Sequence, residues 1–132
     1  MRPLVAIISL FAGGGDFAAG LLLVIVPQTA LRWMHVSPAN DPVWIRFIGV
    51  FVGCVGLTYF LGLLTWYRDR SALELRTVWK LTAMFRLAAG AFVAMAINLG
   101  LLDRAWISVP TADFFWAAVQ LAILRKGFPK DE

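Results

Sequence analysis

The chain has 132 residues, of which 61% are hydrophobic and only 15% are charged. Soluble domains carry about 25% charged residues, so the composition excludes an ordinary water-soluble domain. The net charge of +4 would suggest a nucleic-acid partner in a soluble protein. Here the basic residues flank long apolar blocks, which is the pattern of membrane topology, and no nucleic-acid partner is expected.

Four apolar segments follow one another along the chain. They occupy residues 4–26, 43–67, 72–102 and 105–124. Each has the roughly 20 residues that an α-helix needs to cross a bilayer, and none alternates as a barrel strand does. The first segment is too long for a signal peptide, so we expect a retained helix. The sequence predicts an all-α membrane protein, a single transmembrane domain over residues 1–132 that forms a four-helix antiparallel bundle.

The links between these segments carry helix-ending residues. Pro27 is expected to end or kink the first helix. Residues 28–36 then predict a short interfacial turn in which Leu31, Trp33 and Met34 face lipid. The last two segments are joined by a tight link at residues 102–105, which makes them antiparallel neighbours.

Basic residues and tryptophans predict the orientation. One side of the predicted membrane holds Arg2, Arg68, Arg70, Arg76, Lys80, Arg125, Lys126 and Lys130, and the other holds only Arg32, Arg46 and Arg104. Cytoplasmic loops are enriched in Lys and Arg, so both termini are expected in the cytoplasm, with the chain in a bacterial inner membrane. An interfacial aromatic belt is expected from Trp33, Trp44, Trp66, Trp79 and Trp106.

Four charged residues interrupt the apolar segments: Asp16, Arg46, Arg86 and Asp113. A charge at the centre of a membrane helix costs roughly 2.5–3.5 kcal/mol, so these side chains should face the bundle interior and pair. Arg46 begins near the outer surface and is expected to meet Asp113 or Asp16 first. Arg86 is expected below them.

Each charge shares a helical face with small or amide residues at steps of three and four. Asn98 and Gln120 extend this predicted polar seam. The predicted helix-packing positions are Gly13, Gly20, Gly49, Gly53, Gly56 and Gly90. Two interpretations of the seam stay open: ion pairs that only fix helix register, or a site that binds a ligand.

Other chemistry is scarce in the sequence. Cys54 and His35 are each the only residue of their type, which excludes an intramolecular disulfide and a multi-histidine metal or haem site. We found no H-E-x-x-H or G-x-S-x-G motif, and no catalytic residue, metal or cofactor is predicted. Whether the chain is an enzyme stays open, with a non-enzymatic role favoured.

One family resemblance comes from the general layout and from Arg46-Phe47-Ile48-Gly49, an Arg shortly before a glycine-containing helix face. In these respects the chain resembles small bacterial four-helix membrane proteins of the DoxX-like kind. The resemblance implies a four-helix membrane layout. Some of these relatives are thought to be accessory subunits of membrane oxidoreductases, which implies a place in a larger complex. The resemblance assigns no functional residue.

Three functions are compatible with the sequence. The favoured one is an accessory, assembly or self-associating subunit of a membrane complex, in contact with lipids and with a larger complex or further copies of itself. The alternative is a binder or transporter of a small ligand such as a lipid, quinone or amphiphile, which would use the intramembrane charges as its pocket. An enzyme that acts on a lipid or quinone has the least support, because no reactive group is identified.

Overall fold

The structure is a computed structural model that describes residues 2–129, and within that range it contains helices and links but no strand. The elements are α1 (Arg2–Ile25), α2 (Pro27–Trp33), α3 (Val43–Asp69), α4 (Leu73–Asn98), the 3-10 helix η1 (Arg104–Ile107) and α5 (Ser108–Gly127). Four spans among these residues are long and apolar enough to cross a membrane: α1, α3, α4, and η1 with α5. The prediction of an all-helical chain with four helices long and apolar enough to span a membrane is therefore confirmed for the described residues. Lys130, one of the basic residues that predict the orientation, lies outside the described residues.

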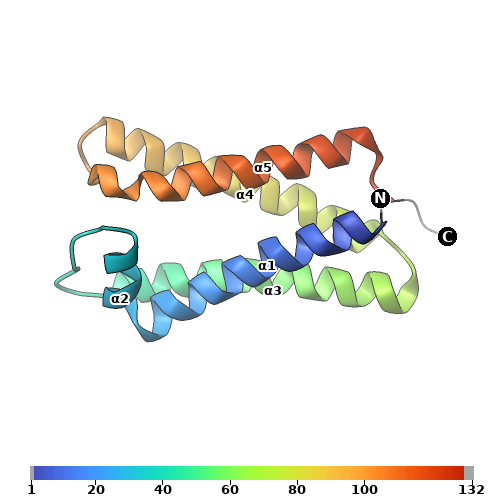
Figure 1. The fold of residues 1–132 in the computed structure, drawn as a ribbon, viewed down its shortest axis with the longest axis horizontal. Helices are drawn as coiled ribbons and strands as arrows, with labels where there is room; N and C mark the ends of the chain where they lie inside the picture. Colours follow the sequence, from blue (N-terminus) through green and yellow to red (C-terminus); the bar gives the residue numbers. More distant parts are fainter. Residues whose placement is uncertain (1, 130–132) are drawn as a thin grey trace.

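The four long helices form two antiparallel pairs. α1 packs most extensively against α3, and α4 packs most extensively against α5. Figure 1 shows the two pairs one above the other. The start of α1, the α3–α4 link and the end of α5 lie together at what we call the basic end. α2 and the α4–α5 link lie at the opposite end, which we call the α2 end.

The close approach of α1 to α3 depends on glycine. A Cβ atom built on Gly20 would lie 2.5 Å from the backbone nitrogen of Gly53, and one built on Gly56 would lie 2.5 Å from the backbone nitrogen of Phe17. The two backbones therefore touch without intervening side chains, as in small-residue packing between membrane helices. Other predicted packing glycines also meet a neighbouring helix: a Cβ would lie 2.6 Å from Tyr59 Cβ at Gly13, 2.7 Å from Leu23 Cβ at Gly49, and 3.0 Å from the Phe114 ring at Gly90.

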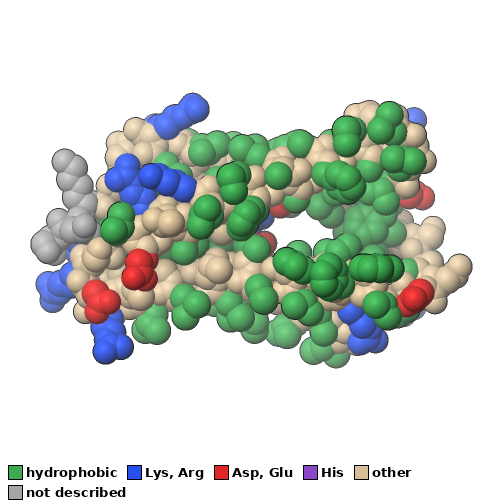
Figure 2. Space-filling view, turned by 180° about the vertical axis from the view of Figure 1, so that it is seen from behind, with side chains coloured by type: hydrophobic (Ala, Val, Ile, Leu, Met, Phe, Trp, Pro, Cys, Tyr) green, Lys and Arg blue, Asp and Glu red, His purple; other side chains and the backbone are tan. Residues whose placement is uncertain are grey.

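The packed core lies toward the basic end of the bundle. Its buried side chains come from all four long helices, from the α3–α4 link and from the residue after α5: Val5, Ala12, Tyr59, Ala72, Leu75, Trp79, Ala117 and Phe128. Toward the α2 end the helix pairs separate, and Figure 2 shows an opening between them with hydrophobic side chains along its rim. Acidic side chains are visible at the inner end of this opening. The bundle is thus closely packed at the basic end, and the opening lies between the helix pairs on the α2 side of this core.

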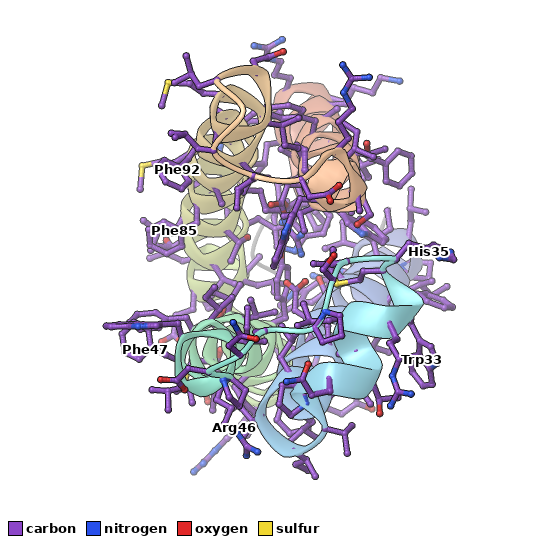
Figure 3. The ribbon with its side chains drawn as sticks, turned by 90° about the vertical axis from the view of Figure 1, so that its left-hand side faces the viewer. Trp33, His35, Arg46, Phe47, Phe85 and Phe92 are labelled. Carbon is purple, nitrogen blue, oxygen red and sulfur yellow. The ribbon has the colours of Figure 1, made fainter. Side chains whose placement is uncertain are left out.

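The segment after α1 differs from the prediction. Residues from Pro27 form the short helix α2, because proline suits the first turn of a helix as well as it ends the one before. Leu31 is buried, so the prediction that it faces lipid is wrong. Trp33, by contrast, is exposed and points away from the bundle (Figure 3).

The link between α4 and α5 is longer than predicted. α4 ends at Asn98, since Gly100 adopts a φ of 70°, the left-handed conformation that commonly terminates a helix. The Asp103 carboxylate then accepts a hydrogen bond from the backbone nitrogen of Ala105 at 2.8 Å and caps η1. α5 follows η1 directly and returns antiparallel to α4, as expected.

Substituting Gly20→Ala should destabilise the bundle. Its new methyl group would meet backbone atoms that cannot move aside, and overpacking of this kind costs about 1–3 kcal/mol. Gly15→Ala is the matched control, because a Cβ there meets nothing within 4 Å. Unfolding in detergent, followed by circular dichroism during titration with sodium dodecyl sulfate, should place the midpoint of Gly20→Ala below that of Gly15→Ala. Equal midpoints would contradict the close backbone contact.

Candidate functional site

An arginine in the interior of α4 binds carboxylates from two other helices. Arg86 Nη2 donates to Asp16 Oδ2 of α1 at 2.5 Å, and Arg86 Nη1 donates to Asp113 Oδ1 of α5 at 3.1 Å. A guanidinium group presents its donors in a rigid planar fork, so it can hold two carboxylates at once. We call Asp16, Arg86 and Asp113 the charged triad. It brings together three of the four intramembrane charges that the sequence singles out.

The three residues meet because they lie at the same level of the bundle. At about 1.5 Å per residue, each lies about 20 Å along its own helix from the basic end. Helices of this length extend for roughly 35–40 Å, so the triad sits near the middle of the spans. This is the depth at which an unpaired charge is most costly, and pairing relieves that cost.

The triad is mostly but not completely buried. The side chain of Arg86 is 7% exposed, and those of Asp16 and Asp113 are 17% and 16% exposed. The two carboxylates therefore remain partly accessible. Both belong to residues in the interior of a long helix. Figure 2 shows acidic side chains beside the opening. With both carboxylates ionised, the triad holds two negative charges against one positive charge.

A second polar layer lies next to the triad, toward the basic end. The Tyr59 hydroxyl of α3 donates to Thr82 Oγ1 of α4 at 2.8 Å. Gln120 Nε2 of α5 donates to the Tyr59 hydroxyl at 2.5 Å and to Thr82 Oγ1 at 2.9 Å. All three residues are buried. Within residues 2–129, Gln120 Oε1 and Arg86 Nε are buried without a hydrogen-bond partner.

A third contact follows one helical turn closer to the basic end. Trp79 Nε1 of α4 donates to Ser9 Oγ of α1 at 2.8 Å, and both residues are fully buried. The prediction that Trp79 belongs to the interfacial belt is therefore wrong. An indole can enter the core when its N–H finds an acceptor, and Ser9 supplies one.

The polar side chains of these three layers recur at seven-residue intervals along the helices. Seven residues make nearly two helical turns, so the side chains lie on nearly the same face. The pairs are Ser9 and Asp16 on α1, Trp79 and Arg86 on α4, and Asp113 and Gln120 on α5. Trp79 and Thr82 are absent from the polar seam that the sequence predicts. The spacing to Arg86 on α4 is the signal that would have found them.

Arg46 does not join the triad. Its Nη1 donates to the backbone carbonyl of Val24 at 2.6 Å, and its side chain lies at the outer edge of α3 (Figure 3). α1 ends at Ile25, and carbonyl groups in the last turn of a helix lack partners within the helix. A cation is favourable at the C-terminal end of a helix, so the end of α1 binds Arg46. The prediction that Arg46 meets Asp113 or Asp16 first is therefore wrong.

Of the two remaining predicted seam residues, one is buried and one is exposed. Gln120 is buried in the second polar layer, whereas Asn98 is exposed at the end of α4 and does not meet the triad.

The other residues with reactive or metal-binding side chains lie away from the triad. Cys54 is exposed on α3, and His35 lies after α2 and points outward (Figure 3). Among the described residues, no group of three or more His, Cys, Asp or Glu side chains lies close enough to hold a metal ion. The chemistry that the triad offers is the binding of charge.

Substituting Arg86→Gln should destabilise the protein strongly, because it leaves two partly buried carboxylates without their cation. Breaking a buried ion pair from one side costs about 3–5 kcal/mol. Adding Asp16→Asn and Asp113→Asn to Arg86→Gln should restore much of the loss, since no uncompensated charge then remains. Unfolding midpoints in detergent measure both effects.

Arg46→Gln serves as the control for this experiment, because Arg46 is exposed and binds only a backbone carbonyl in the described part of the chain. It should cost about 1 kcal/mol or less. If Arg86→Gln and Arg46→Gln were equally mild, the triad would not be holding the helices together.

Comparison with known proteins does not assign the chain to a family. No protein-family model, curated protein or solved structure matches it. The resemblance to DoxX-like proteins therefore stays a prediction. Function has to be inferred from the charged triad and its surroundings.

Proposed function

We propose that the chain is a multi-pass protein of the bacterial inner membrane that binds or transports a small amphiphile at the charged triad. The observation that carries this proposal is the sharing of Arg86 by two partly exposed carboxylates. An excess negative charge at mid-membrane depth is costly, and a proton or a positively charged ligand would neutralise it. The chemistry thus favours a ligand that carries a cationic group.

The surroundings of the triad support an amphiphile over a hydrated ion. The opening between the helix pairs has hydrophobic side chains along its rim (Figure 2), which suits an apolar body. The acidic side chains that Figure 2 shows at its inner end suit a positive charge. Ligand sites in proteins commonly combine apolar walls with a few convergent polar groups, and they often lie between the helices of a bundle.

An accessory or self-associating subunit remains the second candidate, and the same opening favours it. A transmembrane helix of a partner, or of a second copy, could fill the space between the helix pairs. The DoxX-like resemblance points the same way, since some of those relatives are thought to serve as accessory subunits. The two candidates differ in the mass expected for the purified protein. A bound helix adds the mass of a second protein chain, whereas a small ligand adds only its own mass.

The proposed orientation places both termini in the cytoplasm. It is supported by the basic residues that gather at one end of the bundle, among them Arg68, Arg76 and Arg125. In a Cys54→Ala background, Glu74→Cys should react with a membrane-impermeant maleimide only after cell lysis. Ser37→Cys, at the α2 end, should react in spheroplasts. The reverse labelling pattern would invert the topology.

Asp113→Asn should weaken binding of a hydrophobic cation while leaving the fold intact. The variant keeps the pair between Arg86 and Asp16, so the triad becomes electrically balanced and no longer needs a second cation. Tetraphenylphosphonium is a suitable probe because its charge does not depend on pH. Equilibrium dialysis in detergent should show about 30-fold weaker binding than for the unsubstituted protein, the loss typical of a truncated buried charge pair.

The control is Asp69→Asn, which removes an exposed carboxylate at the end of α3. It should bind the probe as the unsubstituted protein does. Equal binding by Asp113→Asn would overturn the ligand proposal. Native mass spectrometry of the same preparation tests the second candidate: a dimer or a copurified subunit without probe binding would favour it, whereas a monomer with bound probe would exclude it.

A further inference from the structure

A groove on the outside of the bundle, separate from the charged triad, has the composition of a lipid site. It runs along the surface between the first half of α1 and the last half of α3 and has a volume of about 870 Å³. Its walls are apolar and include Ala6, Leu10 and Leu64. Ligand pockets typically measure about 300–1,000 Å³, so the groove is large enough for a substantial part of a lipid. No residue of the triad lines it.

Two arginines stand at one end of this groove. Arg2 begins α1, and Arg70 ends α3 in a left-handed conformation with a φ of 55°. Both line the groove, and both lie at the basic end of the bundle. Leu10 lies about 12 Å farther along α1 at 1.5 Å per residue. The groove therefore offers positive charge at one end and an apolar wall that leads away from it into the membrane.

Aromatic residues mark the level of the membrane surface in the groove. Trp66 and Tyr67 line it within one turn of Arg70, and Tyr67 is 92% exposed. Tryptophan and tyrosine are enriched where the hydrocarbon meets the headgroups. The arginines are thus placed at headgroup level while the apolar wall lies at the level of the acyl chains.

We infer that this groove binds an anionic phospholipid, with its phosphate at Arg2 and Arg70 and an acyl chain along α1 and α3. Guanidinium groups bind phosphate through paired hydrogen bonds, and basic residues at the membrane surface recognise anionic lipids. A free phosphate ion would leave the apolar wall uncovered. The inference does not rest on the proposed function, because the two sites share no residue.

The test uses the purified protein in nanodiscs that contain equal amounts of phosphatidylglycerol and phosphatidylcholine. Native mass spectrometry after release from the disc counts the lipids that each protein retains. The unsubstituted protein should retain phosphatidylglycerol in preference. Each arginine near the surface strengthens such binding by about fivefold, so Arg2→Gln with Arg70→Gln should reduce the preference by roughly 25-fold.

Two further comparisons separate the groove from general surface charge. Arg76→Gln with Arg125→Gln removes two exposed arginines from the same end, on α4 and α5, and should retain phosphatidylglycerol normally. Ala6→Phe narrows the groove without altering charge and should lower lipid retention, whereas Ala18→Phe, at an exposed position outside the groove, should not. Retention of both lipids in equal amounts, or the same loss in the control pair as in the groove pair, would overturn the inference. A second copy or another protein retained in place of lipid would overturn it as well.

Discussion

The guanidinium group of Arg86 lies between Asp16 and Asp113, and the arrangement of the bundle depends on this contact. α1 and α5 belong to different helix pairs, and Arg86 on α4 binds a carboxylate from each. Apolar packing alone gives a membrane helix little energetic preference for one partner helix over another, because lipid is as apolar as the side chains. A charged side chain in hydrocarbon, by contrast, is stabilised by pairing with an opposite charge. The triad thereby links the two pairs at one defined level.

The remainder of the packing explains why the triad stays partly accessible. Glycines bring α1 and α3 into backbone contact, and that contact turns the stripe with Gly20 and Gly56 toward α3. The core around Trp79 and the hydrogen-bonded layer of Tyr59, Thr82 and Gln120 then close the basic end. The pairs diverge toward the α2 end, where Figure 2 shows an opening in an apolar surface with acidic side chains beside it. A purely structural ion pair needs no such opening, and an excess negative charge beside it is the reason why we propose a cationic ligand where the sequence alone favoured an accessory role.

Much of the fold and part of the candidate site were predictable from local signals. Segment length and hydropathy predicted the four spans, and helical periodicity placed Asp16, Arg86 and Asp113 on inward faces. The choice of partner was not predictable, because Arg46 and Arg86 are the same residue type and both interrupt an apolar segment. Only the end of α1 at Ile25 made a backbone carbonyl available to Arg46. Trp79 was misplaced for the same kind of reason: its burial depends on Ser9, which is 70 residues away in the chain.

The sequence by itself determined that this protein is helical, that it has four spans long enough to cross a membrane, and that small residues and charges share one face of each. These properties follow from composition and from the period of the helix, both of which act over a few neighbouring residues. The tertiary structure decided which helices pair, which of the two arginines binds the aspartates, and where the bundle remains open. Those choices depend on backbone contacts at glycine and on polar groups that must be satisfied away from water, and such contacts join residues far apart in the chain.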